Sequence, residues 1–291
     1  MAVLAREFAG IMRRHADRTA LGDPDHLLTY RELDRLGGEA AGVLERHRGP
    51  GGPVRAGIHA PNSAGYVVAY LAMLRSGIVP FLLDAALGPE EVASIADRCS
   101  LDLLVHEPDR GPAAGTAAGD LGTITGLRVT ELARTERRYP LRPDTEVCRF
   151  TSGSTGHPNC IEFSGTAVSR AAANWAAGSG LAPDDRIACF AALPNGLAFN
   201  TSLLAAFGTG ASLHLTRGLP TGAHITRMLE RTGATWLVGF PALYESVVRR
   251  DYPVVLGSLY LFTLIGLVVK LIADVLYVVV DPRVQFQSVA K

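Results

Sequence analysis

Short apolar runs alternate with helix-like segments along most of the chain. The apolar run at 54–60 is strand-like, and the segment "SAGYVVAYLAMLRSG" at 63–77 follows it as a helix that ends on Gly77. The same alternation resumes after residue 144. Alternating strands and helices are typical of a largely parallel sheet covered by helices, so the sequence predicts an α/β fold with a mostly parallel sheet.

Residues typical of helix starts locate the beginnings of two predicted helices. Thr29, with Glu32 three residues later, is a capping-box signature for a helix at 28–47, and Pro89 marks the first turn of another helix. Residues 108–126 are rich in Gly, Ala and Pro and predict a loop. The predicted strands are 54–60, 78–85, 101–107, 145–150, 160–164, 186–193, 211–216 and 235–240. The predicted helices are 1–20, 28–47, 63–77, 88–99, 165–177, 196–207, 222–232 and one that begins at Pro241.

The C-terminal part of the chain breaks this pattern. From Val254 to Val280 the chain is apolar except for two charges, Lys270 and Asp274, which are four residues apart and share a helical face. A helix of this length would measure roughly 40 Å, which exceeds the bilayer core of about 30 Å. The segment therefore predicts a hydrophobic, transmembrane-like helix over 254–280, and the alternative is a buried core helix.

Composition and charge exclude some classes of protein. The chain has 291 residues, of which 48% are hydrophobic and 19% charged, enough for a sizeable core in one large domain or two smaller ones. Its 28 basic residues balance 28 acidic ones. No overall field therefore favours nucleic acid, and a phosphate ligand has to be bound locally. Four widely spaced cysteines, without a CxxC motif or an N-terminal signal peptide, predict reduced thiols in the cytoplasm.

The stretch "FTSGSTGHPNC" at 150–160 carries the clearest candidate chemistry, because it lies between two predicted strands. Gly153 and Gly156 allow positive φ, so consecutive backbone N–H groups can converge on an anion. The hydroxyl residues beside them are Thr151, Ser152, Ser154 and Thr155. No lysine follows the second glycine, which excludes the P-loop NTPase motif. On the residues alone, a phosphate-binding loop and an ordinary hairpin loop both remain open.

This stretch resembles the phosphate loop of the AMP-forming adenylate synthetases, the family of acyl-CoA synthetases, luciferases and peptide-synthetase adenylation domains. The family loop runs aromatic-Thr-Ser-Gly-Ser/Thr-Thr-Gly-x-Pro-Lys-Gly, and nine of its eleven positions match here, from Phe150 to Pro158. The resemblance continues in "LTYRELDRLGGEAAGVL", "NSAGYVVAYLAMLRSGIVPFLLDA" and "WLVGFPALYESVVRR". It covers roughly residues 3–250.

The resemblance implies an enzyme that joins a small carboxylic acid to ATP, with Mg²⁺, and forms an acyl-adenylate and pyrophosphate. It assigns phosphate binding to Thr151, Ser152, Gly153, Ser154, Thr155 and Gly156. It assigns no catalytic residue and no metal ligand in this chain.

The chain departs from the family pattern at several of the positions beside this loop. Asn159 replaces the family lysine, and Cys160 replaces the glycine that follows it. In the stretch that corresponds to the family's substrate gate, "LPNGLAFN", Asn195 is near the gate position and Phe199 is the only aromatic residue. A neutral amide holds phosphate less strongly than a cation does, so the loop is expected to bind more weakly than the family's own.

The resemblance also divides the chain near Arg250. Residues 1–250 resemble a truncated N-terminal AMP-binding domain without the family's Mg²⁺ loop and catalytic-lysine domain, so we expect the chain to be inactive alone. Residues 251–291, with "DPRVQF" at 281–286, resemble the C-terminal end of dipeptide- or microcin-type ABC transporter permeases. A natural gene fusion, a frameshifted relic and an assembly error in the source DNA are the three origins of such a join that the sequence leaves open. The alternative function is a membrane-tethered non-enzymatic protein or a permease fragment, cytoplasmic over 1–250 and in contact with the inner membrane through 254–280.

Overall fold

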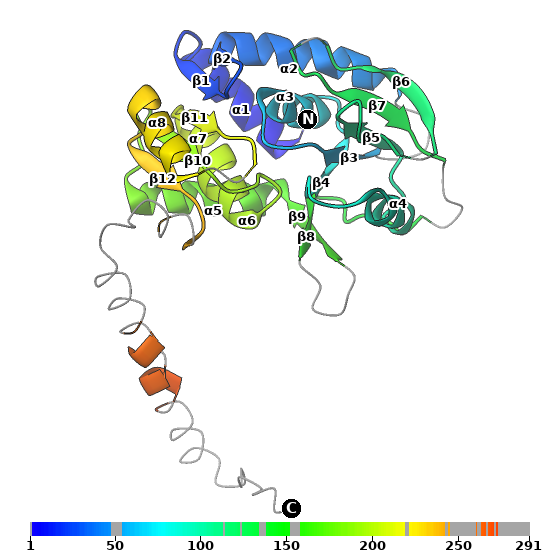
Figure 1. Cartoon of the computed structure of the whole chain (residues 1–291). Helices are drawn as coiled ribbons and strands as arrows, with labels where there is room; N and C mark the ends of the chain where they lie inside the picture. Colours follow the sequence, from blue (N-terminus) through cyan, green and yellow to red (C-terminus); the bar gives the residue numbers. More distant parts are fainter. Residues whose placement is uncertain are drawn as a thin grey trace, which may run out of the picture. The chain divides into compact units, whose positions relative to one another are not determined.

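The computed structural model describes most of the first 241 residues and a few positions after them. The described residues are 2–47, 54–112, 114–122, 124–133, 138–151, 158–218, 221–241, 244, 260, 263–265, 267–270 and 272. The chain divides into two compact units, Met1–Phe240 and Pro241–Lys291. All the helices and strands named below lie in the first unit (Figure 1). A domain boundary near Arg250 remains a prediction.

The first unit contains a seven-stranded sheet in the order β6-β7-β5-β3-β4-β8-β9. Its parallel centre is made of β3 (Arg55–His59), β4 (Val79–Leu83), β5 (Leu103–His106) and β8 (Thr145–Thr151). Its antiparallel flanks are β6 (Thr116–Asp120), β7 (Arg128–Glu131) and β9 (Asn159–Ser164). Every residue of β3 and β4 is buried, as expected for central strands covered on both faces.

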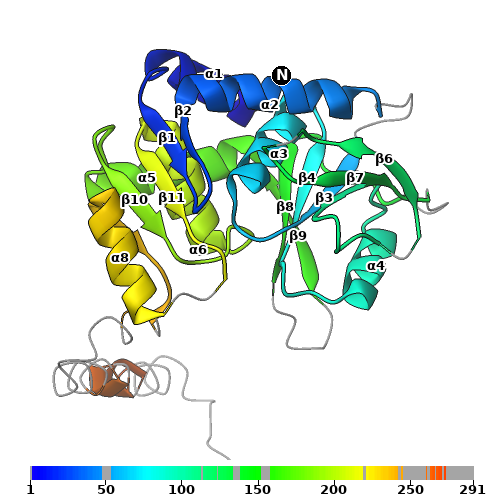
Figure 2. The ribbon, with the colours of Figure 1, turned by 45° about the horizontal axis from the view of Figure 1, so that its top comes forward.

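A second sheet of five strands lies beside it, in the order β12-β10-β11-β1-β2 (Figures 1 and 2). Its strands are β1 (Thr19–Gly22), β2 (Leu27–Thr29), β10 (Arg186–Cys189), β11 (Ser212–Leu215) and β12 (Trp236–Val238). All neighbours run parallel except the β1–β2 pair. The predicted α/β fold is confirmed, with the refinement that the predicted sheet is two mixed sheets that have parallel centres.

The helices pack around and between the sheets. They are α1 (Val3–Arg14), α2 (Tyr30–Glu45), α3 (Ala64–Arg75), α4 (Pro89–Arg98), α5 (Gly165–Ser179), α6 (Gly196–Ala198), α7 (Ala205–Thr209) and α8 (Gly222–Thr232). The predicted capping box opens α2: Thr29 Oγ1 accepts from the Glu32 N–H at 3.2 Å, and the Glu32 carboxylate accepts from the Thr29 N–H at 2.8 Å. Figure 2 shows α2 extending along both sheets.

Helix α3 is buried on all sides, from Ala64 to Leu74. It contacts β3 and β4 of the larger sheet on one side and α1 and α2 on others. This explains why its sequence is apolar all round rather than amphipathic.

Four strands were not predicted: β1, β2, β6 and β7. β1 begins inside the predicted helix 1–20, which ends at Arg14, and β2 overlaps the start of the predicted helix 28–47. β6 lies within the predicted loop 108–126, where "TAAGD" is largely exposed at the edge of the sheet. Of these strands, β2 and β6 lie at sheet edges, where strands bury little side-chain surface, so their sequences lack the apolar signal that marks central strands.

The predicted helix 196–207 is irregular. It begins as α6, continues as a π-helical segment η1 (Phe199–Leu204), and ends as α7, where Gly210 adopts a left-handed φ of 92°. A π-helical segment accommodates an extra residue in a helix, and such segments are frequent at functional sites. Sequence periodicity indicated the helix but not this change of winding.

The predicted hydrophobic helix over 254–280 lies mostly outside the described residues. Within it, residues 260, 263–265, 267–270 and 272 are helical and exposed. Among the residues that the structure describes, no helix combines the length and the hydropathy that crossing a membrane requires. The transmembrane prediction therefore finds no support.

Candidate functional site

The predicted phosphate loop connects two paired strands. β8 and β9 are antiparallel neighbours, with Phe150 opposite Cys160 and Thr151 opposite Asn159 (Figure 1). Thr151 is therefore the exposed last residue of β8, and Asn159 begins β9. The predicted binding residues Ser152, Gly153, Ser154, Thr155 and Gly156 lie outside the described residues. Their role in phosphate binding remains a prediction.

The position of this hairpin in the sheet places its connection at the edge where such sheets bind ligands. Because β8 is parallel to β4 and, through β4, to β3 and β5, the loop leaves the sheet at the carboxyl ends of these strands. Ligands of open α/β sheets bind at this edge, where loops and helix N-termini gather.

Asn62 joins this edge to the second sheet. It follows β3, is 8% exposed, and its Nδ2 donates to the Ala191 carbonyl at 2.9 Å. Its Oδ1 accepts from the Leu193 N–H, also at 2.9 Å. Ala191 and Leu193 follow β10, so one amide side chain fixes the carboxyl ends of strands from both sheets.

Asp23 makes a second link of the same kind. Asp23 follows β1 directly. Its carboxylate accepts hydrogen bonds from the backbone N–H groups of Ala64, Asp25 and His26 at 2.8, 2.8 and 2.6 Å. Burial alone would raise the pKa of Asp23, but these three hydrogen bonds outweigh it and hold the pKa below its ordinary value. The carboxylate is thus charged at neutral pH and anchors the first turn of α3.

The stretch that corresponds to the predicted substrate gate follows β10. Asn195 is exposed and is the N-cap of α6, where its Oδ1 accepts from the Leu197 N–H at 2.9 Å. Phe199 is fully buried at the start of η1, and its ring meets that of Tyr70 edge to face, with centroids 5.5 Å apart. The two gate residues are thus divided between the surface and the interior.

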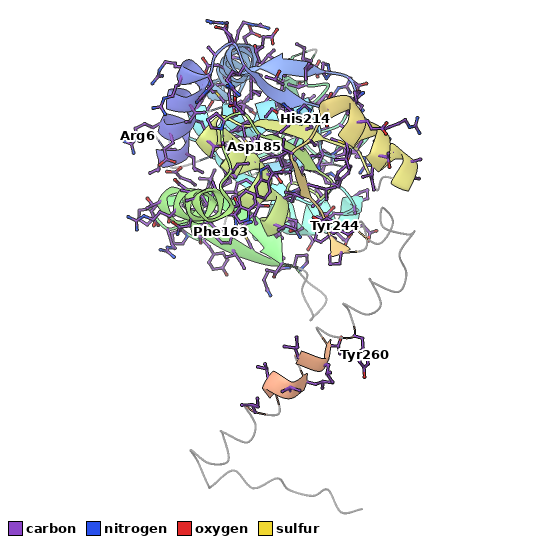
Figure 3. All side chains as sticks on the ribbon, turned by 90° about the vertical axis from the view of Figure 1, so that its left-hand side faces the viewer. Arg6, Phe163, Asp185, His214, Tyr244 and Tyr260 are labelled. Carbon is purple, nitrogen blue, oxygen red and sulfur yellow. The ribbon has the colours of Figure 1, made fainter. Side chains whose placement is uncertain are left out.

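Arg149 is a residue of this region that the sequence prediction missed. It lies on β8, two residues before Thr151, and is 8% exposed. Its guanidinium carbon is 4.2 Å from the ring centroid of Phe163 and 5.2 Å from that of Phe199. Phe163, labelled in Figure 3, lies on the strand that leads into α5. The available signal was a lone cation inside the otherwise apolar run "VCRF".

Cys160, the residue in place of the family glycine, is not an activated nucleophile. Its thiol hydrogen-bonds those of Cys148 and Cys99, and the bond to Cys148 raises the pKa of Cys160 to about 12. A thiol with this pKa is protonated at neutral pH, whereas nucleophilic cysteines have lowered pKa values.

Two hollows lined by described residues lie elsewhere. One, of about 470 Å³, is bordered by Asp23, Arg186, His214 and Arg231. The other, of about 540 Å³, lies among α1, α5 and α7. Neither is bordered by β8 or β9, so their volumes say nothing about the loop.

The described residues contain no group of three or more His, Cys, Asp or Glu side chains that could hold a metal ion. Mg²⁺ in nucleotide enzymes is commonly held by one or two carboxylates and the substrate phosphates. This finding therefore does not test Mg²⁺, which remains an expectation from the family resemblance.

Comparison with protein families gives one match that covers most of the chain. The model described as "AMP-binding enzyme" matches residues 8–266. The match extends beyond Arg250 into the segment that resembles a permease.

Among curated relatives, the chain is 28% identical over 270 residues to a (methyl-dioxo-octahydroindenyl)propanoyl:CoA ligase of Mycobacterium tuberculosis, covering 84% of this chain and 52% of the relative. It is 32% identical over 258 residues to the phosphinothricin tripeptide synthetase PhsC of Streptomyces viridochromogenes, covering 83% of this chain and 23% of the relative. The chain thus spans about half the length, or less, of these relatives.

A short part of the chain matches a different class of protein, a transporter permease. It is 42% identical over 68 residues to the inner membrane ABC transporter permease protein YejB of Escherichia coli O157:H7, covering 23% of this chain and 18% of that protein. This agrees with the predicted permease-like segment, and it is far too short to indicate a transporter.

Solved structures show the same fold as the first unit. The O-succinylbenzoate coenzyme A synthetase of Bacillus subtilis, in complex with AMP, has a TM-score of 0.69 and 19% identity, with 85% of this chain and 64% of that chain covered. The N-terminal subdomain of Klebsiella oxytoca NpsA has a TM-score of 0.64 and 22% identity, with 81% and 60% covered. At these identities the comparison shows the fold alone.

Proposed function

Because this chain belongs to the AMP-binding enzyme family, we propose that it forms the nucleotide-binding and acid-binding part of a ligase that joins a carboxylate to ATP. The observation that carries the proposal is the β8–β9 hairpin, whose Ser/Thr/Gly-rich connection leaves the sheet at the carboxyl ends of its parallel strands.

In this proposal a carboxylate oxygen attacks the α-phosphorus of ATP, and pyrophosphate leaves. The loop holds the β- and γ-phosphates so that the leaving oxygen stays in line, and its amides and hydroxyls stabilise the charge that develops. The residues proposed for this task are Thr151, Ser152, Gly153, Ser154, Thr155 and Gly156.

The acid is proposed to lie beside the gate stretch that follows β10. Asn195, at the surface end of α6, and Phe199, at the buried start of η1, would border it. Links from Asn62 and Asp23 hold the surrounding strand ends together, which would keep acid and nucleotide in a fixed relation.

The acid, the thiol acceptor and the need for Mg²⁺ are proposals that come from the relatives. That the 291-residue polypeptide is inactive by itself remains a prediction. The membrane-tethered alternative is not favoured, because the family match covers most of the chain.

Titration of the purified chain with ATP tests the proposal. The variant Gly153→Ala/Gly156→Ala is expected to bind ATP at least about tenfold more weakly, because an added Cβ limits positive φ and the convergence of the loop amides. The matched control is Gly10→Ala/Gly178→Ala, since an added Cβ at either position meets nothing within 4 Å. Absence of ATP binding in the wild type, or equal affinity in the loop variant, would contradict the proposal.

Restoring the family lysine is expected to strengthen phosphate binding. Asn159 is exposed at the start of β9, directly after the loop, so Asn159→Lys would place an ammonium group beside the triphosphate. A charge-assisted hydrogen bond is roughly twice as strong as a neutral one, so about a tenfold gain in affinity for ATP is expected.

Isothermal titration with ATP and with AMP measures this gain. The gain should be much smaller for AMP, which lacks the β- and γ-phosphates, and should shrink as salt rises. Asn174→Lys makes the same substitution at an exposed position of α5 and is the matched control. Equal gains from both variants would indicate a general charge effect and would speak against this position.

A further inference from the structure

Arg149 is a buried cation whose donors are only partly used. Nε and Nη1 are buried and have no hydrogen-bond partner among the described residues. The rings of Phe163 and Phe199 provide cation–π contacts, but ring faces leave the in-plane N–H groups of a guanidinium unpaired. Burial therefore lowers the pKa of Arg149 below its ordinary value.

Unpaired buried charges are rare in folded proteins, because desolvation of an ion costs several kcal/mol. One polar atom nearby is unpaired too: the hydroxyl of Tyr70, on α3, whose ring meets that of Phe199, has no partner among the described residues. Polar groups without partners thus gather where β8, α3 and η1 meet. A ligand with its own polar atoms would satisfy them.

The surrounding backbone leaves room for the guanidinium. Gly196 lies so close that an added Cβ would be 2.8 Å from Arg149 Nη1. Any residue other than glycine would therefore displace the side chain. The π-helical winding of η1 begins three residues later, at Phe199, whose ring contacts the same guanidinium.

Arg149 is also close to the expected reaction centre. It precedes Thr151 by two residues, and two residues of extended strand span about 7 Å. A small acid whose reacting carboxylate lies at the phosphate loop would therefore have its far end within reach of this side chain.

We propose that Arg149 binds a second, non-reacting carboxylate of the acid substrate, so that the substrates of this site are small dicarboxylic acids. This inference rests on the proposed function. The unpaired Nε and Nη1, with the aromatic side chains of Phe163 and Phe199, form the receptor, and Gly196 leaves the room that Nη1 itself occupies. Guanidinium donors match the oxygens of a carboxylate in charge and in geometry.

A nucleotide phosphate is the other anion that could reach this side chain. The carboxylate is favoured because the guanidinium lies against Phe163 and Phe199 and beside the gate glycine Gly196, rather than at the exposed end of β8. Binding of a carboxylate and binding of a phosphate predict different results for one variant, Arg149→Met. This variant retains a side chain of similar volume and removes the charge.

The experiment measures binding of two pairs of acids to the full 291-residue chain in the presence of ATP, at matched ionic strength. The pairs are isophthalate with benzoate, and glutarate with pentanoate. We expect the wild type to bind each dicarboxylate at least about tenfold more tightly than its partner, because a charge-assisted hydrogen bond is worth about 1.5–3 kcal/mol. In Arg149→Met this preference should fall to about one, with ATP affinity unchanged, and Arg149→Lys should retain part of it.

Arg170→Met, at an exposed position of α5, is the control and should keep the preference. Three results would overturn the inference: equal affinity of the paired acids in the wild type, a preference that survives in Arg149→Met, or a loss of ATP affinity in Arg149→Met. A flat ATP titration of the wild type would instead refute the proposed function, whatever the acids do.

Thermal unfolding distinguishes a structural role of Arg149 from a role in substrate binding. Replacing an unpaired buried charge by an apolar side chain of similar volume is often neutral or stabilising, so Arg149→Met should melt no lower than the wild type. If that variant does not fold, Gly196→Ala provides the test, because its Cβ would displace Nη1. The dicarboxylate preference should then fall in Gly196→Ala, and an unchanged preference would overturn the inference.

Discussion

Replacing Gly65 by alanine is expected to lower the free energy of unfolding by about 3 kcal/mol or more, because buried overpacking against unyielding neighbours is costly. Gly65 lies in the first turn of α3, and an added Cβ would overlap the carbonyl oxygen of Thr125 and be 2.9 Å from its Cα. These are backbone atoms of the turn between β6 and β7. Neither α3, buried on all sides, nor this turn can move without disturbing its neighbours.

Urea unfolding of the purified variant measures this effect. Gly178→Ala is the matched control: it changes a helical glycine whose added Cβ meets nothing within 4 Å. Alanine there should stabilise by up to about 1 kcal/mol through helix propensity and the entropy of the unfolded chain. Equal unfolding midpoints for the two variants would show that α3 and the turn at Thr125 are not in contact as described.

Replacing Asn62 by alanine is expected to cost about 2–5 kcal/mol. The substitution leaves the buried Ala191 carbonyl and Leu193 N–H without partners, and each unpaired buried group costs about 1–3 kcal/mol. The damage should reach the proposed site, because Asn62 is the link between strand ends of the two sheets. ATP affinity should therefore fall even in conditions where Asn62→Ala remains folded.

Two further variants make the Asn62 experiment specific. Asn174→Ala removes an exposed amide from α5 and should change stability by less than about 0.5 kcal/mol. Asn62→Asp retains an acceptor for the Leu193 N–H but loses the donor to the Ala191 carbonyl, and it buries a charge. It should therefore be at least as unstable as Asn62→Ala. Wild-type stability in both Asn62 variants would rule out the proposed link between the strand ends of the two sheets.

Much of the fold could be predicted from the sequence because local signals agreed with the tertiary structure. The run "TEVCRF", the small-residue loop and "CIEFS" predicted the β8–β9 hairpin, and Thr29 with Glu32 predicted the start of α2. Central strands such as β3 and β4 were visible because both of their faces are buried. These elements depend on short-range patterns, which a sequence displays directly.

The features that could not be predicted depend on tertiary neighbours. β6 contains Gly and Ala at an exposed edge, and it forms a strand only because β7 is present to pair with it. The contacts of Arg149 with Phe163 and Phe199 join residues of two strands and a helix. The two hydrogen bonds of the Asn62 side chain likewise connect positions far apart in the sequence, with a separation of 129 residues for one bond and 131 for the other. Nothing in the local sequence marks such pairs.

The π-helical segment Phe199–Leu204 also affects how substrate preference is transferred between relatives. One extra residue in a helix turns everything before it by about 100° relative to everything after it. A relative that lacks this residue would present a different side chain at each equivalent place on the wall of the proposed acid site, even where the two sequences align. Specificity rules derived from such relatives would need a one-residue offset between Asn195 and Ala205 before they apply to this chain.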